Sequence, residues 1–229
     1  MLTTSALYQT LLHMEGTVKE VRAVIDGETY GEDRIVSLST SANLFPEDTM
    51  GIGGAVAKEI EIAVRAPGNI PRMARIVPSF RLVNGAQASE WIQKGVYYIS
   101  NRSVDSISGV VTIHGYDDML KAEQTWEPDQ SLTFPMTMAA AAQEIADLMG
   151  VTIDPRTVLS TAYTVDYPAN DYTLRDVLRY IAAAHAGNWI MTDAGQLRLV
   201  TFGEIPAETY YLVTEYGSAI TFGGDRILV

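Results

Sequence analysis

Short β-prone segments separated by turn residues fill the first half of the sequence, and this pattern limits the folds open to the chain more than any other feature. Asp26-Gly27 and Asn84-Gly85 are tight-turn signals, and each follows a stretch rich in Val, Ile or Leu. Six or so strands with short spacings and turn chemistry of this kind predict an antiparallel barrel or sandwich. The predicted strands are residues 18–25, 35–38, 55–64, 74–83, 90–101 and 109–116.

Residues 55–64 contain charged residues among the apolar ones, yet they keep a strand-like alternation. Val56 shares one face with the later apolar residues if a bulge or twist shifts it. The segment is therefore predicted to be a single strand. It is entered from residues 43–54, which hold three glycines and a proline and are interpreted as a loop.

A helix is predicted over residues 138–149, because apolar residues recur there at helical spacing. Thr137 is its N-cap candidate, and Gly150 lies just past its end. A shorter helix is predicted over residues 5–14, with Gly16 as its stop. The apolar stripe of the longer helix is Met138, Ala141, Ala142, Ile145, Leu148 and Met149.

A further helix is predicted to start at Thr173. Thr173 and Asp176 have the spacing of a capping box, with Asp in place of the usual Glu. Gly187 is predicted to end this helix, and a strand at residues 188–192 and a turn at residues 193–195 follow it. The inner stripe of the helix is Leu174, Val177, Leu178 and Ile181, and the return strand places Leu197 and Leu199 on one face.

These elements predict an α+β protein in three parts. Residues 1–121 are assigned to an N-terminal antiparallel β-barrel domain. Residues 122–203 are assigned to a small α/β domain with two helices on a small sheet. Residues 204–229 form a β-rich tail that is interpreted as the start of a second barrel.

The charge balance argues against nucleic acid as a partner. The formal net charge is −12, so a polyanion would be repelled. The sequence contains no cysteine, which excludes disulfides and thiolate metal sites. No apolar run reaches the roughly 18 residues that a membrane-spanning helix needs, and the N-terminus lacks the pattern of a signal peptide. We therefore expect no specific nucleic-acid site and no membrane span.

No residue is assigned a catalytic, cofactor-binding or metal-binding role. His13, His114 and His185 lie far apart in different predicted elements, and a lone histidine in a helix or strand is more often structural. Asp117-Asp118 directly follows a predicted strand. Acidic residues at a helix N-terminus are favoured there over a catalytic carboxylate pair, because adjacent helical residues point in different directions.

Two other features have both a functional and a structural interpretation. Residues 51–54 (GIGG) lack the spacing of a dinucleotide fingerprint and precede a strand, which favours a plain loop. Trp91, Trp126 and Trp189 sit in or beside predicted elements and are interpreted as core or interface anchors. An aromatic platform for sugars is the alternative.

Two parts of the sequence resemble the baseplate hub proteins of long-tailed phages, a family also called tail-associated lysins and carried by prophages and phage-tail-like particles. Residues 95–100 (GVYYIS) with residues 110–120 (VVTIHGYDDML) are similar to the end of that family's first barrel. Residues 172–199 are similar to its helix, glycine stop, strand, turn and strand, and residues 137–153 to the partner unit. The resemblance covers about residues 90–203 well and the N-terminal strands only loosely.

The resemblance implies a structural protein that closes the tail tube as a trimeric ring and anchors the tail tip or spike. Its partners would be further copies of the chain, a tail tube or distal tail protein above, and a spike or tail fibre below. It would belong to the virion tail and be assembled in the host cytoplasm. Family members have two related barrels, whereas only some 27 residues follow Phe202 here, so we expect either an N-terminal fragment of a longer hub or a reduced second barrel.

An enzyme and a sugar-binding module are the alternatives. A cell-wall or glycan hydrolase would need two positioned carboxylates or a metal site, and the sequence shows neither pattern. A carbohydrate-binding module would use exposed aromatic residues such as Trp91 or Trp126. The charged fraction of only 19% and the 12 tyrosines suit burial against neighbouring subunits. The favoured hypothesis is therefore a structural protein that is not an enzyme.

Overall fold

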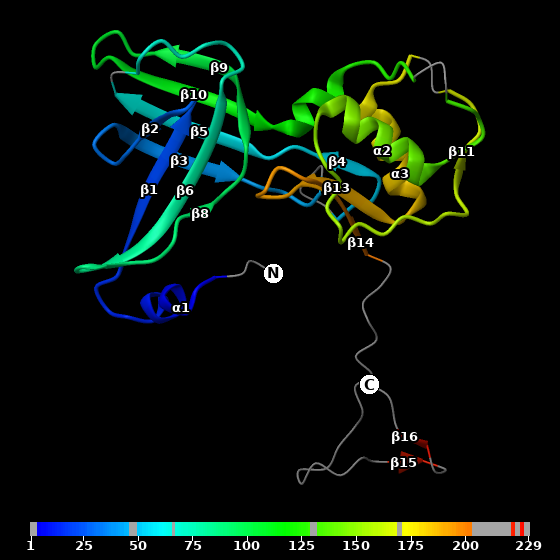
Figure 1. Ribbon diagram of the computed structural model, residues 1–229, viewed down its shortest axis with the longest axis horizontal. Coiled ribbons are helices and arrows are strands. Elements are labelled where there is room, and N and C mark those ends of the chain that lie inside the picture. Colours follow the sequence, from blue (N-terminus) through cyan, green and yellow to red (C-terminus); the bar gives the residue numbers. More distant parts are fainter. Residues whose placement is uncertain are drawn as a thin grey trace.

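The computed structural model describes residues 4–45, 50–65, 67–128, 132–168, 171–202, 221–222 and 225–226. It shows an α+β protein in which strands predominate, as the sequence predicts. A large antiparallel sheet, here called the β unit, lies beside a smaller group of two helices and three strands, here called the α/β unit (Figure 1).

The β unit is a nine-stranded sheet whose main path runs in the order β2-β1-β6-β9-β10-β5-β3, and two short strands, β7 and β8, pair with β6 beside it. Neighbouring strands are antiparallel throughout. Strand bounds are β1 Val18–Ile25, β2 Glu28–Tyr30, β3 Ile35–Ser41, β5 Glu59–Arg65, β6 Arg75–Asn84, β7 Gln87–Ala88, β8 Ile92–Gln93, β9 Tyr97–Val104 and β10 Val110–Asp117.

The hairpin between β1 and β2 turns where the sequence predicts. Asp26 and Gly27 have positive φ angles of 49° and 85°, as both central residues of a type I′ turn require. Gly adopts this conformation without steric cost, and Asp tolerates it better than most residues. The predicted turns after Asn84 and at residues 106–109 are also confirmed.

The large sheet curls around a buried hydrophobic core. Ile60, Ile62 and Val64 of β5 face this core, and side chains from β1, β6, β9 and β10 join the same cluster. Residues 31–34 carry the chain from β2, at one edge of the sheet, to β3, at the other. No ladder between described residues joins those two edges, so closure into a barrel remains a prediction.

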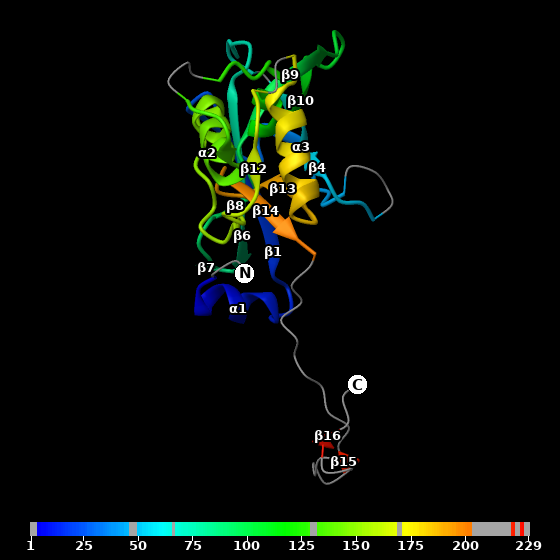
Figure 2. The ribbon, with the colours of Figure 1, turned by 90° about the vertical axis from the view of Figure 1, so that its right-hand side faces the viewer.

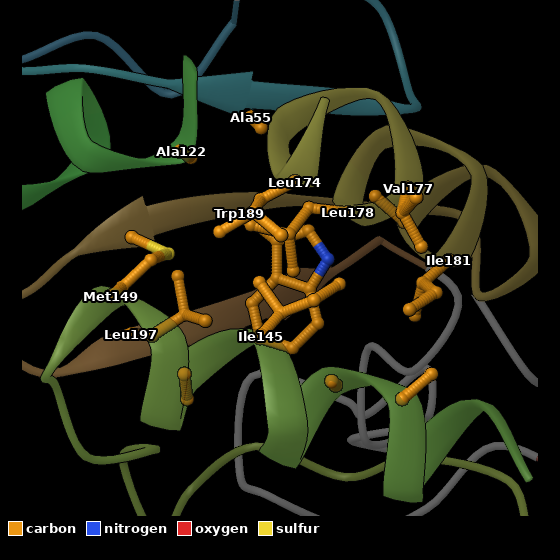
Figure 3. Packing of buried hydrophobic residues seen from close by; sticks show 14 of the residues in the cluster. Ala55, Ala122, Ile145, Met149, Leu174, Val177, Leu178, Ile181, Trp189 and Leu197 are labelled. Atoms are coloured by element: carbon orange, nitrogen blue, oxygen red, sulfur yellow. The ribbon is translucent and has the colours of Figure 1, made fainter. Parts of the chain in front are cut away.

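The α/β unit packs two helices with a three-stranded sheet around a second core. Trp189 is fully buried there, and Figure 3 shows it between Ile145 and Leu178. Figure 2 shows the two helices side by side. The sheet order is β14-β13-β4, and the bounds are β4 Gly54–Val56, β13 Gly187–Met191, β14 Leu197–Thr201, α2 Met138–Met149 and α3 Leu174–Ala184.

The predicted helix ends are confirmed. Thr137 caps α2 by accepting a hydrogen bond from the backbone N–H of Ala140, and Gly150 ends the helix in a left-handed conformation. Thr173 and Asp176 form the predicted capping box of α3. The N-terminal helix, α1 Ala6–Leu12, is capped by Ser5 and lies against β6.

The single strand predicted over residues 55–64 is wrong. The segment forms β4 in the α/β unit and β5 in the β unit. Between them, the backbone N–H of Lys58 donates to the carboxylate of Asp117 at 2.9 Å instead of joining a ladder. Val56 therefore belongs to a different sheet from the apolar residues of β5, and no bulge is needed to align it.

Three smaller expectations also need correction. Residues 90–101 form two strands, β8 and β9, which are separated at Gly95 with a φ of 124°. Leu148 is 47% exposed although it was assigned to the inner stripe of α2, because the buried face turns through Ala146 instead. Helix α3 stops before Gly187, which opens β13.

Several short elements complete the described structure. A 3-10 helix, η1 Asp118–Glu123, leaves the end of β10.

No helix in the described ranges is long and apolar enough to cross a membrane. The division of the chain at residues 121 and 203 remains a prediction, and the predicted tail at 204–229 lies largely outside the described residues. The other short strands are β11 Met136–Thr137, β12 Thr164–Val165, β15 Thr221–Phe222 and β16 Asp225–Arg226.

Candidate functional site at the junction of the two units

One buried amide fixes β4 in the α/β unit. Asn188 of β13 is 0% exposed. Its Oδ1 accepts a hydrogen bond from the backbone N–H of Gly54 at 2.7 Å, and its Nδ2 donates to the carbonyls of Leu44 at 3.0 Å and Gly51 at 2.7 Å. Residues 51–53 are thus part of a loop, as predicted, and this loop is held against β13.

A charged bridge joins the two units. The Nζ of Lys58 lies 2.6 Å from one carboxylate oxygen of Asp193, in the turn between β13 and β14, and the Nζ of Lys94 lies 3.3 Å from the other. Burial pushes the pKa of Asp193 upward, but the two ammonium groups outweigh burial and hold that pKa below its usual value. Asp193 is therefore a charged link between segments that are far apart in the sequence.

Asp117 is buried at the same junction. It is 1% exposed, and its carboxylate accepts hydrogen bonds from the backbone N–H groups of Lys58 at 2.9 Å and Met119 at 3.0 Å. Burial raises the pKa of Asp117 to about 6, against the opposing effect of these two hydrogen bonds. Asp118 instead pairs with Lys121 at 2.6 Å. The two carboxylates therefore have separate partners, and the interpretation of Asp117-Asp118 as acidic residues at a helix N-terminus is confirmed, with Asp117 as the cap.

A groove of about 440 Å³ opens beside this junction. It is lined by β4, the end of β10, η1 and the first turn of α3. Arg175 on its wall pairs with Glu123 at 2.8 Å and donates to the carbonyl of Met119 at 3.0 Å. These contacts bind α3 to η1, so the guanidinium helps to hold together the helices of the α/β unit.

One sequence feature indicates a buried polar contact at this junction. Asn188 is a polar residue near the start of an otherwise apolar strand (GNWIM), where a buried amide must find partners. Lys58 and Asp193 gave no comparable signal. They lie 135 residues apart, and only the folded chain brings them together.

The three histidines are not brought together. His13 follows α1, and His114 lies on the exposed face of β10, with its Nδ1 3.5 Å from Glu61. The ring of His185 lies at the end of α3, where its Nε2 accepts a hydrogen bond from the backbone N–H of Ser160 at 2.9 Å. No group of three or more acidic or histidine side chains among the described residues is placed to hold a metal ion.

The tryptophans divide into two kinds. Trp126 and Trp189 are buried in the core of the α/β unit, so Trp126 is a core anchor and does not form an exposed sugar platform. Trp91 is half-buried, and the guanidinium groups of Arg22 and Arg81 lie 4.1 Å and 4.6 Å from its ring centre. Its ring is already in contact with two cations.

Comparison with known proteins identifies the fold. No protein-family model and no curated protein match the chain. Its structure is similar to the 43 kDa tail protein of prophage MuSo2 from Shewanella oneidensis, with a TM-score of 0.54 and 11% identity over 85% of this chain. It is also similar to a tail protein from Neisseria meningitidis MC58, with a TM-score of 0.53 and 15% identity over 82% of this chain.

The chain spans 59% of the first of these tail proteins and 52% of the second. At such low sequence identity, the likeness shows a common fold. The shared fold covers most of both the β unit and the α/β unit.

Proposed function

We propose that the chain is a structural protein of a phage or prophage tail, and specifically a baseplate hub that closes the tail tube and anchors the tail tip or spike. The observation that carries this proposal is the shared fold with two tail proteins over more than four fifths of the chain. The resemblance of residues 95–120 and 172–199 to hub proteins supports the more specific position.

In the proposed hub, copies of the chain form a trimeric ring in the virion tail. A tail tube or distal tail protein binds above the ring, and a spike or fibre binds below it. The contacts at the junction support such a role, because Lys58 and Lys94 pair with Asp193 and so tie the two units to each other. A part that transmits load along a tail needs a fixed geometry between its units.

The proposed role has no enzymatic step. The alternatives remain a tail-tip module that binds carbohydrate or degrades cell wall. A cell-wall zymogram and a glycan array with the full chain test them directly. A cleared band, or a glycan signal that Trp91→Ala removes, would favour these alternatives over the structural role.

Gold labelling of whole particles tests the tail assignment. Particles are induced from the strain that carries the gene and labelled with an antibody raised against the 229-residue chain. We expect gold at the distal end of the tail. Labelling along the tube would keep a tail role but overturn the hub position. Labelling of the capsid, or of no particle, would overturn the proposal.

A further inference from the structure

Three arginines of the β unit lie on the loop before β6, at the start of β6 and on β9. Arg72 and Arg102 line one hollow beside Met73, and Arg75 follows at the start of β6, opposite Tyr98 of β9. None of the three arginines forms an ion pair with a described residue. The Nη1 of Arg102 donates to the carbonyl of Ile70 at 2.6 Å, which fixes the direction of that side chain. We call Arg72, Arg75 and Arg102 the arginine patch.

Exposed apolar side chains follow both Arg72 and Arg102 along the chain. Met73 and Val104 are exposed, and Ile107, in the turn of the β9–β10 hairpin, is 96% exposed. Arginine and methionine are enriched at protein interfaces, and exposed apolar side chains beside them lower the free energy when covered. These side chains therefore have the composition of a contact surface.

Three acidic residues of the α/β unit carry the opposite charge. Glu127 and Asp171 line one hollow, and Asp166 and Tyr167 lie a few residues before Asp171. Tyr167 is 80% exposed, and the exposed ring of Tyr172 makes an edge contact with another tyrosine on α3. None of the three acidic residues forms an ion pair with a described residue. We call Glu127, Asp166 and Asp171 the acidic patch.

We propose that the arginine patch of one copy binds the acidic patch of the next. This inference rests on the proposed ring and names the surfaces that build it. A three-fold ring requires two different patches on each copy, because its contacts are heterologous. The arginine patch belongs to the β unit and the acidic patch to the α/β unit, and these units lie side by side (Figure 1), so one copy can present each patch to a different neighbour.

Electrostatic complementarity favours pairing of the arginine patch with the acidic patch. Residues 1–116 contain ten Lys and Arg against twelve Asp and Glu, whereas residues 117–229 contain six against sixteen. Contacts between two acidic halves would be repulsive, and contact between unlike patches is attractive. Exposed tyrosines beside the acidic patch also offer ring faces to arginines. Screening by salt at these exposed sites weakens the contact.

Charge reversal in the full chain tests the pairing. One variant carries Arg72→Glu with Arg75→Glu, a second carries Glu127→Lys with Asp166→Lys, and a third carries all four. Sedimentation equilibrium at low and high salt gives the association constant. We expect each double variant to lower it by about tenfold or more. The variant with all four substitutions restores unlike charges. It should recover the association constant to within about threefold of the value for the unmodified chain.

Lys19→Glu is the matched control for Arg72→Glu, since it makes the same charge change on β1, outside both patches. Circular dichroism and Tm verify that each variant is folded. Assembly that both double variants leave unchanged would overturn the pairing and leave the ring standing. If the variant with all four substitutions is folded but does not recover the association constant, the pairing is overturned as well. A chain that stays monomeric at every concentration would overturn the pairing and the ring together.

Discussion

At the scale of single residues, the junction depends on polar groups that are buried and fully engaged. Asn188 accepts from Gly54 and donates to two carbonyls across more than 130 positions of sequence. A buried amide in such a position is costly when its partners are lost and specific when they are present. It therefore selects one placement of β4 among those that an apolar side chain would allow.

Asn188→Ala should lower the free energy of unfolding by about 2–4 kcal/mol, because one N–H and two carbonyls lose their partner inside the protein. Urea unfolding at neutral pH measures the change. The control is Asn84→Ala, whose amide bonds Glu15 and Thr17 near the surface. Asn84→Ala should lower the free energy of unfolding by clearly less than Asn188→Ala does. Equal effects of the two substitutions would contradict the special position of Asn188.

Asp117 gives the protein a pH-dependent stability with a definite sign. Because burial raises its pKa from 3.8 to about 6 in the folded chain, the folded state binds the proton more tightly than the unfolded state. This contribution is complete below pH 4 and is lost as the pH rises through 6. Its size is on the order of 3 kcal/mol.

Asp117→Asn should remove that contribution. We expect the difference in unfolding free energy between the native chain and this variant to change between pH 4 and pH 7 and to be flat outside that window. Urea unfolding at several pH values gives the difference directly, and subtraction cancels the other carboxylates. A difference that is constant over this range would show that Asp117 titrates normally.

At the scale of elements, the close approach of β13 and β14 depends on Gly187. A Cβ at this position would lie 2.5 Å from the carbonyl oxygen of Val200. Gly187→Ala should therefore push the strands apart and lower the free energy of unfolding by about 1–3 kcal/mol. Thermal unfolding measures the effect. Gly68→Ala, whose Cβ would meet only the end of Glu28 at 3.5 Å, should leave the Tm nearly unchanged.

The elements that could be predicted from the sequence are those that local interactions determine. The caps of α2 and α3 and the Asp26-Gly27 turn depend on residues within four positions of each other, and all are confirmed. The split of residues 55–64 depends on Asn188 and Asp117, which lie far along the chain. No local pattern distinguishes that split from a bulge.

The same reason explains why the junction was not predicted as a site. The contacts of Lys58 with Asp117 and Asp193 join residues 59 and 135 positions apart, and Lys58 and Asp193 look like ordinary surface polar residues in the sequence. The burial pattern of α2 shows a smaller case. Leu148 fits the helical spacing, but the packing of neighbouring elements decides which edge of the stripe is covered.

At the scale of the whole molecule, the bridge between Lys58 and Asp193 couples the two units. Lys58→Met and Asp193→Asn should each lower the free energy of unfolding. The double variant should cost less than the sum of the two, with a coupling energy of about 1 kcal/mol for this partly buried pair. A double-mutant cycle by urea unfolding measures the coupling.

The control cycle uses Arg34 and Glu28, which form an ion pair at 2.6 Å within the β unit. Glu28 is more exposed than either partner of the bridge, so solvent screens this pair and its coupling should be weaker. A coupling for Lys58 and Asp193 no larger than that of the control would mean that the bridge adds little to the contact between the units.

Because β4 comes from the early part of the chain yet completes the sheet around Trp189, the helical half is not a separable module. A graft of residues 117–202 onto another scaffold would leave Asn188 without its two acceptors, the carbonyls of Leu44 and Gly51, and without its donor, the N–H of Gly54, so residues 44–56 would have to be included. During translation, β4 is synthesised long before its partner strand β13. The ribosome must deliver about 130 further residues before this short strand can find its neighbour.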